Sequence, residues 1–167
     1  MKTLFLILLF PFLTQGDLPN SLEKKVDKNI RRSFDLENII RTEVELNSTF
    51  EDRPEIGLHL YTLEDQENLL GYLLVTTAKG RHDYFDYSVI YNTDLSIRNV
   101  SILVYRSDHG YEITQKKWLN QFKDKKGCEL DYGEEIDAIS GATYSASSIT
   151  EDLKLLCNLL PDLVNQK

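Results

Sequence analysis

The sequence predicts an α+β fold, in which one antiparallel sheet of about four strands is accompanied by an N-terminal helix, a short middle helix and a C-terminal helix. Two observations predict it. Apolar residues recur at helical spacing near both ends of the chain, and the middle consists of aliphatic, β-branched and aromatic segments separated by turns. A chain of 167 residues has room for one such domain.

The first sixteen residues have the pattern of a secretory signal peptide. Lys2 supplies one positive charge, and a run of roughly ten apolar residues follows before small or uncharged residues at 14–16. A comfortable membrane span needs about 20 apolar residues. We therefore expect residues 1–16 to be removed during export, which leaves a single domain over residues 17–167. An uncleaved membrane anchor is the alternative.

The segment after this run predicts an amphipathic helix. Leu22, Val26, Ile30 and Phe34 are spaced four apart within residues 20–34, and charged side chains occupy much of the remainder. This spacing gives a helix one apolar stripe. We expect that stripe to cover one face of the sheet.

The middle of the chain predicts four strands in hairpin succession. In residues 54–63 the apolar period changes to two, so Ile56, Leu58 and Leu60 are expected on one face of a strand. Strands joined by short turns form an antiparallel meander. The other three strand segments are residues 68–80, 84–91 and 96–105.

A short helix is expected after the strands. Ile113, Trp118 and Phe122 lie at roughly helical spacing, and the helix should open from Thr114. A polar loop then leads to the last part of the chain.

The last helix is predicted by a second apolar repeat. Ser148 and Glu151 have the spacing of a capping box, and Pro161 discourages continuation of the helix. The repeat consists of Ile149, Leu153, Leu156 and Leu160.

The two cysteines are Cys128 and Cys157. A disulfide between them is possible in an oxidising compartment. Cys157, however, falls beside the apolar stripe of the last helix, where a free cysteine often acts as a small core residue. We therefore expect Cys157 to be buried and unbridged.

Small and hydroxyl-bearing residues crowd the stretch DAISGATYSASS at residues 137–148, just before the last helix. A helix start exposes unpaired backbone N–H groups and the positive end of the helix dipole. Gly141 and Ala142 would let an anion approach the backbone, while Ser140 and Thr143 would donate from their hydroxyls. The stretch predicts a phosphate site. A serine-rich helix cap without a ligand is the alternative.

Residues 137–143, with the sequence DAISGAT, resemble the Asp-x-x-Ser/Thr-Gly-Ala-Thr motif of the FMN-binding domain family. That family includes the C subunit of the sodium-pumping NADH:quinone reductase and the G subunit of the Rnf complex. The resemblance extends over about residues 68–160. It implies that Thr143 carries FMN through a phosphoester bond, and that a separate flavin transferase installs it.

A flavin ring also needs an apolar or aromatic surface to lie against. Tyr105, Tyr144 and Trp118 are candidates for an aromatic surface under the flavin ring. The family has a Gly-Gly step where this chain has Gly110-Tyr111, so the loop contacts with the flavin should differ. The expected FMN site consists of Asp137, Ser140, Gly141, Ala142, Thr143, Tyr144 and Ser145.

Composition excludes several other functions. The chain has a formal net charge of −8, so it should repel nucleic acid. His59, His82 and His109 are scattered, and His82 is expected at a solvated hairpin end rather than in a metal site. No catalytic residue and no metal ligand is predicted.

These features together predict an exported FMN-binding flavoprotein that carries electrons outside the cytoplasm. Its expected partners are the flavin transferase and redox partner proteins, including membrane-bound ones. The alternative is a secreted, non-redox binding module that holds a phosphate-bearing ligand at a helix N-terminus. A self-sufficient flavin reductase is less favoured, because the sequence has no nicotinamide-binding fingerprint.

Overall fold

A computed structural model describes residues 18–46, 56–127 and 129–165 of the chain. Five antiparallel strands form one sheet in the order β1-β2-β3-β4-β5, so each strand pairs with the next along the chain. The strands are β1 (Ile40–Val44), β2 (His59–Asp65), β3 (Asn68–Lys79), β4 (Tyr84–Asn92) and β5 (Ile97–Val104). The predicted α+β meander is confirmed, with one strand more than expected.

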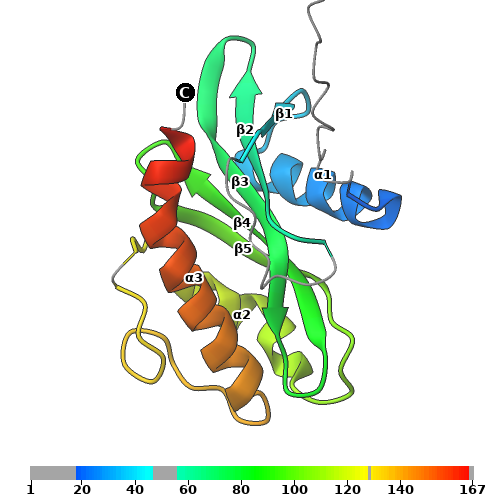
Figure 1. Cartoon of the computed structure of the whole chain (residues 1–167), viewed down its shortest axis with the longest axis vertical. Coiled ribbons are helices and arrows are strands. Elements are labelled where there is room, and N and C mark those ends of the chain that lie inside the picture. The colour runs from blue at the N-terminus through cyan, green and yellow to red at the C-terminus, as the bar shows by residue number, and fades with distance from the viewer. Residues whose placement is uncertain (1–17, 47–55, 128, 166–167) are drawn as a thin grey trace, which may run out of the picture.

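Helical segments flank the sheet on both faces (Figure 1). Helix α1 precedes the strands, and three short segments and a long helix follow them. Their bounds are α1 (Asn20–Phe34), η1 (Tyr111–Thr114), α2 (Lys116–Leu119), η2 (Asn120–Phe122) and α3 (Thr143–Val164).

Alternation along the strands supplies two separate cores. In β3, Leu73 and Val75 pack on the α1 side, whereas Leu74 and Ala78 pack on the α3 side. Successive strand residues point to opposite faces, so a strand covered on both faces reads as a continuous apolar run. The stripe on α1 fills one of these cores, which confirms that the first helix covers one face of the sheet.

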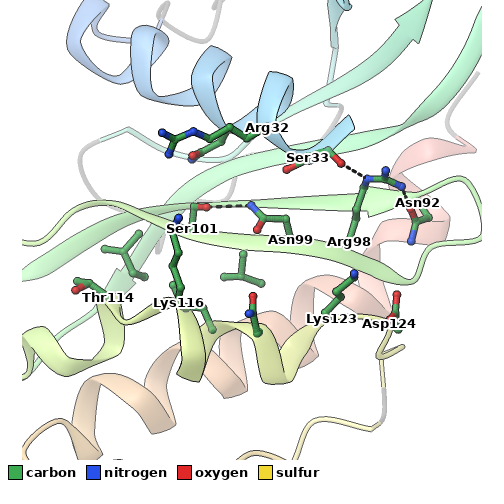
Figure 2. Close-up of a pocket in the computed structure, with 15 residues that line it drawn as sticks. Arg32, Ser33, Asn92, Arg98, Asn99, Ser101, Thr114, Lys116, Lys123 and Asp124 are labelled. Carbon is green, nitrogen blue, oxygen red and sulfur yellow. Dashed lines mark hydrogen bonds between the residues drawn. The ribbon is translucent and has the colours of Figure 1, made fainter. Parts of the chain in front are cut away.

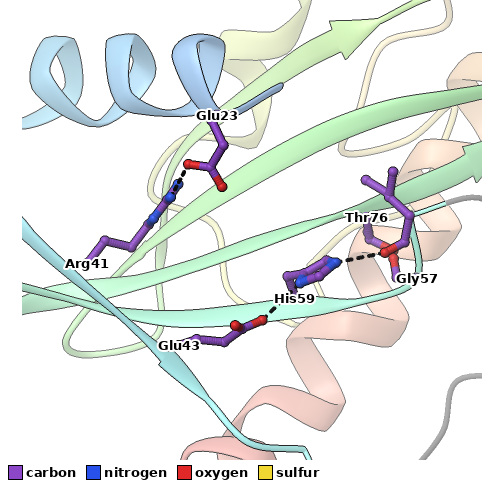
Figure 3. Close-up of polar contacts among 7 residues, drawn as sticks. Glu23, Arg41, Glu43, Gly57, His59 and Thr76 are labelled. Carbon is purple, nitrogen blue, oxygen red and sulfur yellow. Dashed lines mark hydrogen bonds and ion pairs between the residues drawn. The ribbon is translucent and has the colours of Figure 1, made fainter. Parts of the chain in front are cut away.

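The strand that sequence analysis missed is β1. It lies at the sheet edge, and its sequence IRTEV has no buried residue. Charged side chains are typical of edge strands, because they discourage pairing with another chain. Arg41 of β1 forms an ion pair with Glu23 of α1, and Glu43 lies 2.9 Å from Nδ1 of the buried His59 (Figure 3). Backbone pairing with β2 and these polar contacts therefore hold the strand, and Val44 packs half-buried against the core.

Ile56, Leu58 and Leu60 were expected on one face of a strand, and this expectation is wrong for Ile56. Leu58 and Leu60 belong to the core beneath α3, but Ile56 packs against the core beneath α1. Gly57, between them, has a φ of 71° and interrupts the extended backbone. The strand accordingly begins at His59.

The predicted middle helix is shorter and more broken than expected. Only residues Lys116–Leu119 are α-helical, and the cap is Gln115 rather than Thr114. Two 3-10 turns flank it, which are η1 and η2. The apolar residues Ile113, Trp118 and Phe122 are all buried, so the spacing identified the core residues correctly.

Two expectations about the ends of α3 are wrong. The helix begins at Thr143, so Ser148 and Glu151 lie inside it and cannot form its capping box. It also continues through Pro161 to Val164. Burial of Leu160 and Leu163 on the sheet offsets the hydrogen bond that a proline removes from a helix.

Two polar contacts lie along the interface between α3 and β4. Tyr87 Oη donates to Asp152 at 2.5 Å, and Cys157 Sγ lies 3.6 Å from Tyr91 Oη. Cys157 is free and buried, as predicted, whereas Cys128 lies outside the described residues. The pKa of the Cys157 thiol is raised by burial. Burial, together with the neighbouring Cys157, also raises the pKa of Tyr91.

The N-terminal segment 1–17 and the expected cleavage site likewise lie outside the described residues. Within the part of the chain that the structure describes, no helix combines the length and the apolar character needed to cross a membrane.

The raised pKa values of Cys157 and Tyr91 predict that the protein loses stability in alkaline solution. A group whose pKa is higher in the folded state stabilises the fold below its unfolded pKa, and that stabilisation is lost as the pH rises. For Cys157 the loss should begin near the ordinary thiol pKa of 9.0. Urea unfolding at pH 8 and pH 10 should show a smaller decrease in stability for Cys157→Ala than for the wild type. Equal decreases would contradict this assignment.

Candidate functional site

The motif at residues 137–143 forms the loop that enters α3. Gly141 has a φ of 87°, Ala142 is the N-cap, and Thr143 is the first helical residue. Ala142 is buried in the core, whereas Thr143 is exposed to solvent. The buried Ala142 side chain thus anchors the loop, and the Thr143 side chain next to it is exposed to solvent.

The first turn of α3 has open backbone donors. Ala142 makes no side-chain cap hydrogen bond, and the first turn contains no acidic residue. A 22-residue helix therefore begins with N–H groups and a positive dipole end that no side chain neutralises. This arrangement suits an anion, as the sequence predicted.

A pocket of about 860 Å³ opens at this helix start. We call it the motif pocket. Its volume lies within the usual range for small-molecule sites, roughly 300–1,000 Å³. It is formed by the end of β3, the loop after β5 and the first turns of α3. Its lining residues are Lys79, Arg81, His109, Gly110, Gly141, Ala142, Thr143, Tyr144, Ser145, Ser147, Ser148 and Glu151.

Ser145 lines the motif pocket but is almost wholly buried, at 2% exposed. Its Oγ lies 3.0 Å from Tyr105 Oη, which in turn donates to the His109 carbonyl at 2.7 Å. Gly110 has a φ of 88°, and an added Cβ would lie 2.5 Å from Tyr105 Oη. Ser145 and Tyr105 therefore hold the loop after β5 against α3, at a point where only glycine fits.

Tyrosines lie around this site. Tyr144 lines the motif pocket and is 49% exposed. Tyr111, which sequence analysis did not select, is 66% exposed and meets the Tyr105 ring edge-on at 6.1 Å. These rings offer an aromatic surface for a planar ligand.

Trp118 is a core residue that packs under the motif loop, and it does not line the motif pocket. It is buried, and its ring packs edge-on against Phe122 at 5.3 Å. Its Nε1 donates to the Asp137 carbonyl at 2.8 Å, while the Asp137 N–H donates to Gln121 Oε1 at 2.8 Å. Asp137 itself is exposed, and its backbone atoms make these contacts.

Two cations in the motif pocket were missed by sequence analysis. Lys79 ends β3, and Arg81 follows it in the hairpin that leads to β4. An added Cβ on Gly80 would lie 3.5 Å from Ser145 Oγ, so this hairpin packs against the first turn of α3. Lys79 and Arg81 lie at the pocket only because the fold places this hairpin beside α3.

The same hairpin changes the interpretation of two histidines. His82 was expected at a solvated hairpin end; it is exposed, but its ring lies 6.4 Å from that of His109 at the motif pocket. Among the described residues, no group of three or more histidine, cysteine or acidic side chains is placed to hold a metal ion.

Glu112 lies behind the motif loop. An added Cβ on Gly141 would come within 3.1 Å of Glu112 Oε1. Glu112 Oε2 is buried and has no hydrogen-bond partner in the described part of the chain. A buried acceptor without a partner can accept a hydrogen bond from water or from a ligand hydroxyl.

Residues 80–156 match the model of the FMN-binding domain. No curated protein matches the chain. The match covers β4, β5, the short helical segments, the motif loop and most of α3. Residues 80–156 are thus similar to an FMN-binding domain, and this similarity indicates FMN as the cofactor.

The motif pocket fits FMN on two counts. The open helix start and two cations suit the phosphate, and the ring of Tyr144 suits the isoalloxazine ring. The residues expected from Ser140 to Ser145 lie together in the motif loop and the first turn of α3.

The cations in the motif pocket predict salt-sensitive FMN binding. In a Thr143→Ala background, which allows only noncovalent binding, Lys79→Gln or Arg81→Gln should weaken FMN affinity by about threefold to tenfold at low salt. Lys28→Gln, on α1 at the other face of the sheet, is the control and should change nothing. Flavin fluorescence titration measures the affinity. Equal effects of all three substitutions would show that only overall charge matters.

Proposed function

We propose that Thr143 carries FMN as a phosphoester and that the loaded protein transfers electrons outside the cytoplasm. The single observation that supports this best is the position of Thr143. Its side chain is exposed at the first helical residue, where the N–H groups of α3 can hold a phosphate bonded to the same residue. Export is supported by the signal-peptide pattern of residues 1–16.

Attachment requires help from another protein. A threonine hydroxyl is a weak nucleophile near neutral pH and needs an activating base or metal. No lysine or histidine lies within residues 137–143. A flavin transferase would remove the Oγ proton, form the bond from Thr143 Oγ to phosphorus, and expel the leaving group from an activated flavin nucleotide. The exposed hydroxyl is accessible to such an enzyme.

The remaining residues bind and orient the cofactor. Lys79 and Arg81 would offset the phosphate charge, and the first turn of α3 would donate to its oxygens. Tyr144 would supply apolar ring surface within the pocket, and the exposed Tyr111 follows the lining residue Gly110. FMN, when bound, supplies one-electron and two-electron transfer. A covalent bond would prevent loss of the cofactor in a compartment where it is hard to replace.

Substitution of Thr143 tests the attachment site. After co-expression with a flavin transferase, the intact wild-type chain should gain the mass of FMN less one water. Thr143→Ala should abolish the gain and alter the free energy of unfolding by less than about 0.5 kcal/mol, since the side chain is exposed. Thr143→Ser should retain some attachment because the hydroxyl remains.

The matched controls are other hydroxyls of the same region. Ser140→Ala and Ser145→Ala should keep the mass gain. Gly141→Val should block attachment differently, because a β-branched residue is strained at a φ of 87° and its Cβ would meet Glu112. A mass gain that persists in Thr143→Ala would refute the proposed acceptor.

A further inference from the structure

A second pocket, of about 650 Å³, lies between the C-terminal part of α1, strand β5 and the segments α2 and η2 (Figure 2). We call it the basic pocket. It shares no lining residue with the motif pocket. Its volume falls within the same range for small-molecule sites.

Four cationic side chains from different elements line the basic pocket. Their charge is opposite to that of the whole chain, which has 27 acidic residues against 19 basic ones. Asp124 is the sole acidic residue among those that line the pocket. The cations are Arg32, Arg98, Lys116 and Lys123.

Two of these cations have structural reasons for their position. Arg98 Nε donates to the Ser33 carbonyl at 2.9 Å, and its guanidinium lies 4.2 Å above the Phe34 ring. Arg32 belongs to the last turn of α1, where a cation interacts favourably with the helix dipole.

No comparable contact explains the positions of Lys116 and Lys123 among the described residues. Neither forms an ion pair with a carboxylate among the described residues, and Figure 2 shows Lys116 extending from α2 toward Ser101 of β5. Like charges around one cavity repel each other, and an anion bound between them would relieve that repulsion.

The rest of the lining favours a compact phosphate compound. Amide and hydroxyl donors surround the cations, and Asn99 Nδ2 donates to Ser101 Oγ at 3.0 Å on the β5 wall. Val100, Ile102 and Leu119 add apolar surface, but no aromatic ring is among the lining residues. Such a wall can bind several phosphate oxygens but offers no ring on which a nucleobase could stack.

We propose that the basic pocket binds a free, non-aromatic small molecule that carries two or more phosphate groups. The ligand would bridge Lys116 and Lys123 to Arg32 and Arg98, and the amide and hydroxyl groups would bind its remaining oxygens. This site is independent of FMN attachment.

Calorimetric titration of the full chain with tripolyphosphate tests the proposal. We expect saturable one-to-one binding that weakens about tenfold in Lys116→Gln/Lys123→Gln. Both lysines are exposed, so the double variant should fold, which its thermal unfolding would verify. Lys117→Gln is the matched control; it removes an exposed lysine next to Lys116 that does not line the pocket, and should bind normally.

A second control separates the two pockets. Lys79→Gln/Arg81→Gln alters the motif pocket and should leave tripolyphosphate binding unchanged. The proposal is overturned if no saturable binding occurs, if Lys117→Gln weakens binding as much as the double variant, or if binding depends on Lys79 and Arg81.

Discussion

The packing of α3 across the sheet determines where its first turn lies, and the candidate site depends on that position. Leu153 and Leu156 are fully buried against the sheet, and Ala142 anchors the N-cap in the same core. The helix start is therefore held next to the end of β3 and the loop after β5. Thr143 is exposed but fixed in position, because Ala142 before it and Ser145 and Ala146 shortly after it are buried.

The two faces of the sheet have different roles. The α3 face provides the helix start, the motif loop and the Ser145–Tyr105 contact that closes the loop after β5. The α1 face is held by its own apolar core and by the polar contacts of β1. Strands β3 and β4 are buried over most of their length, so the sheet gives the motif pocket, which opens at the end of β3, a rigid base.

Local signals in the sequence were sufficient to predict the α+β fold, the covering helix and the position of the motif loop just before α3. They failed where tertiary contacts decide the structure. The strand β1 has no buried residue and no apolar alternation, because it lies at the sheet edge and is held by pairing with β2 and by an ion pair to α1. Pro161 remains helical because burial of the last turn outweighs its local cost.

The site residues that were missed lie far from the motif in sequence. Lys79 and Arg81 reach the pocket only because the hairpin between β3 and β4 packs against α3, and Glu112 lies behind the motif loop, close to Gly141. Trp118 was selected as a possible flavin contact because it is aromatic, but its side chain belongs to the core under the loop. A linear sequence does not record such packing.

The most direct test of the central claim is to locate the flavin within the chain itself. Trypsin should release residues 127–154 as one peptide, since no lysine or arginine lies between Lys126 and Lys154. Fragmentation of this peptide from the native host, with the flavin mass retained, should place FMN on Thr143. Flavin on any other hydroxyl of the peptide, or a wholly unmodified peptide from a flavin-containing preparation, would contradict covalent attachment at the start of α3.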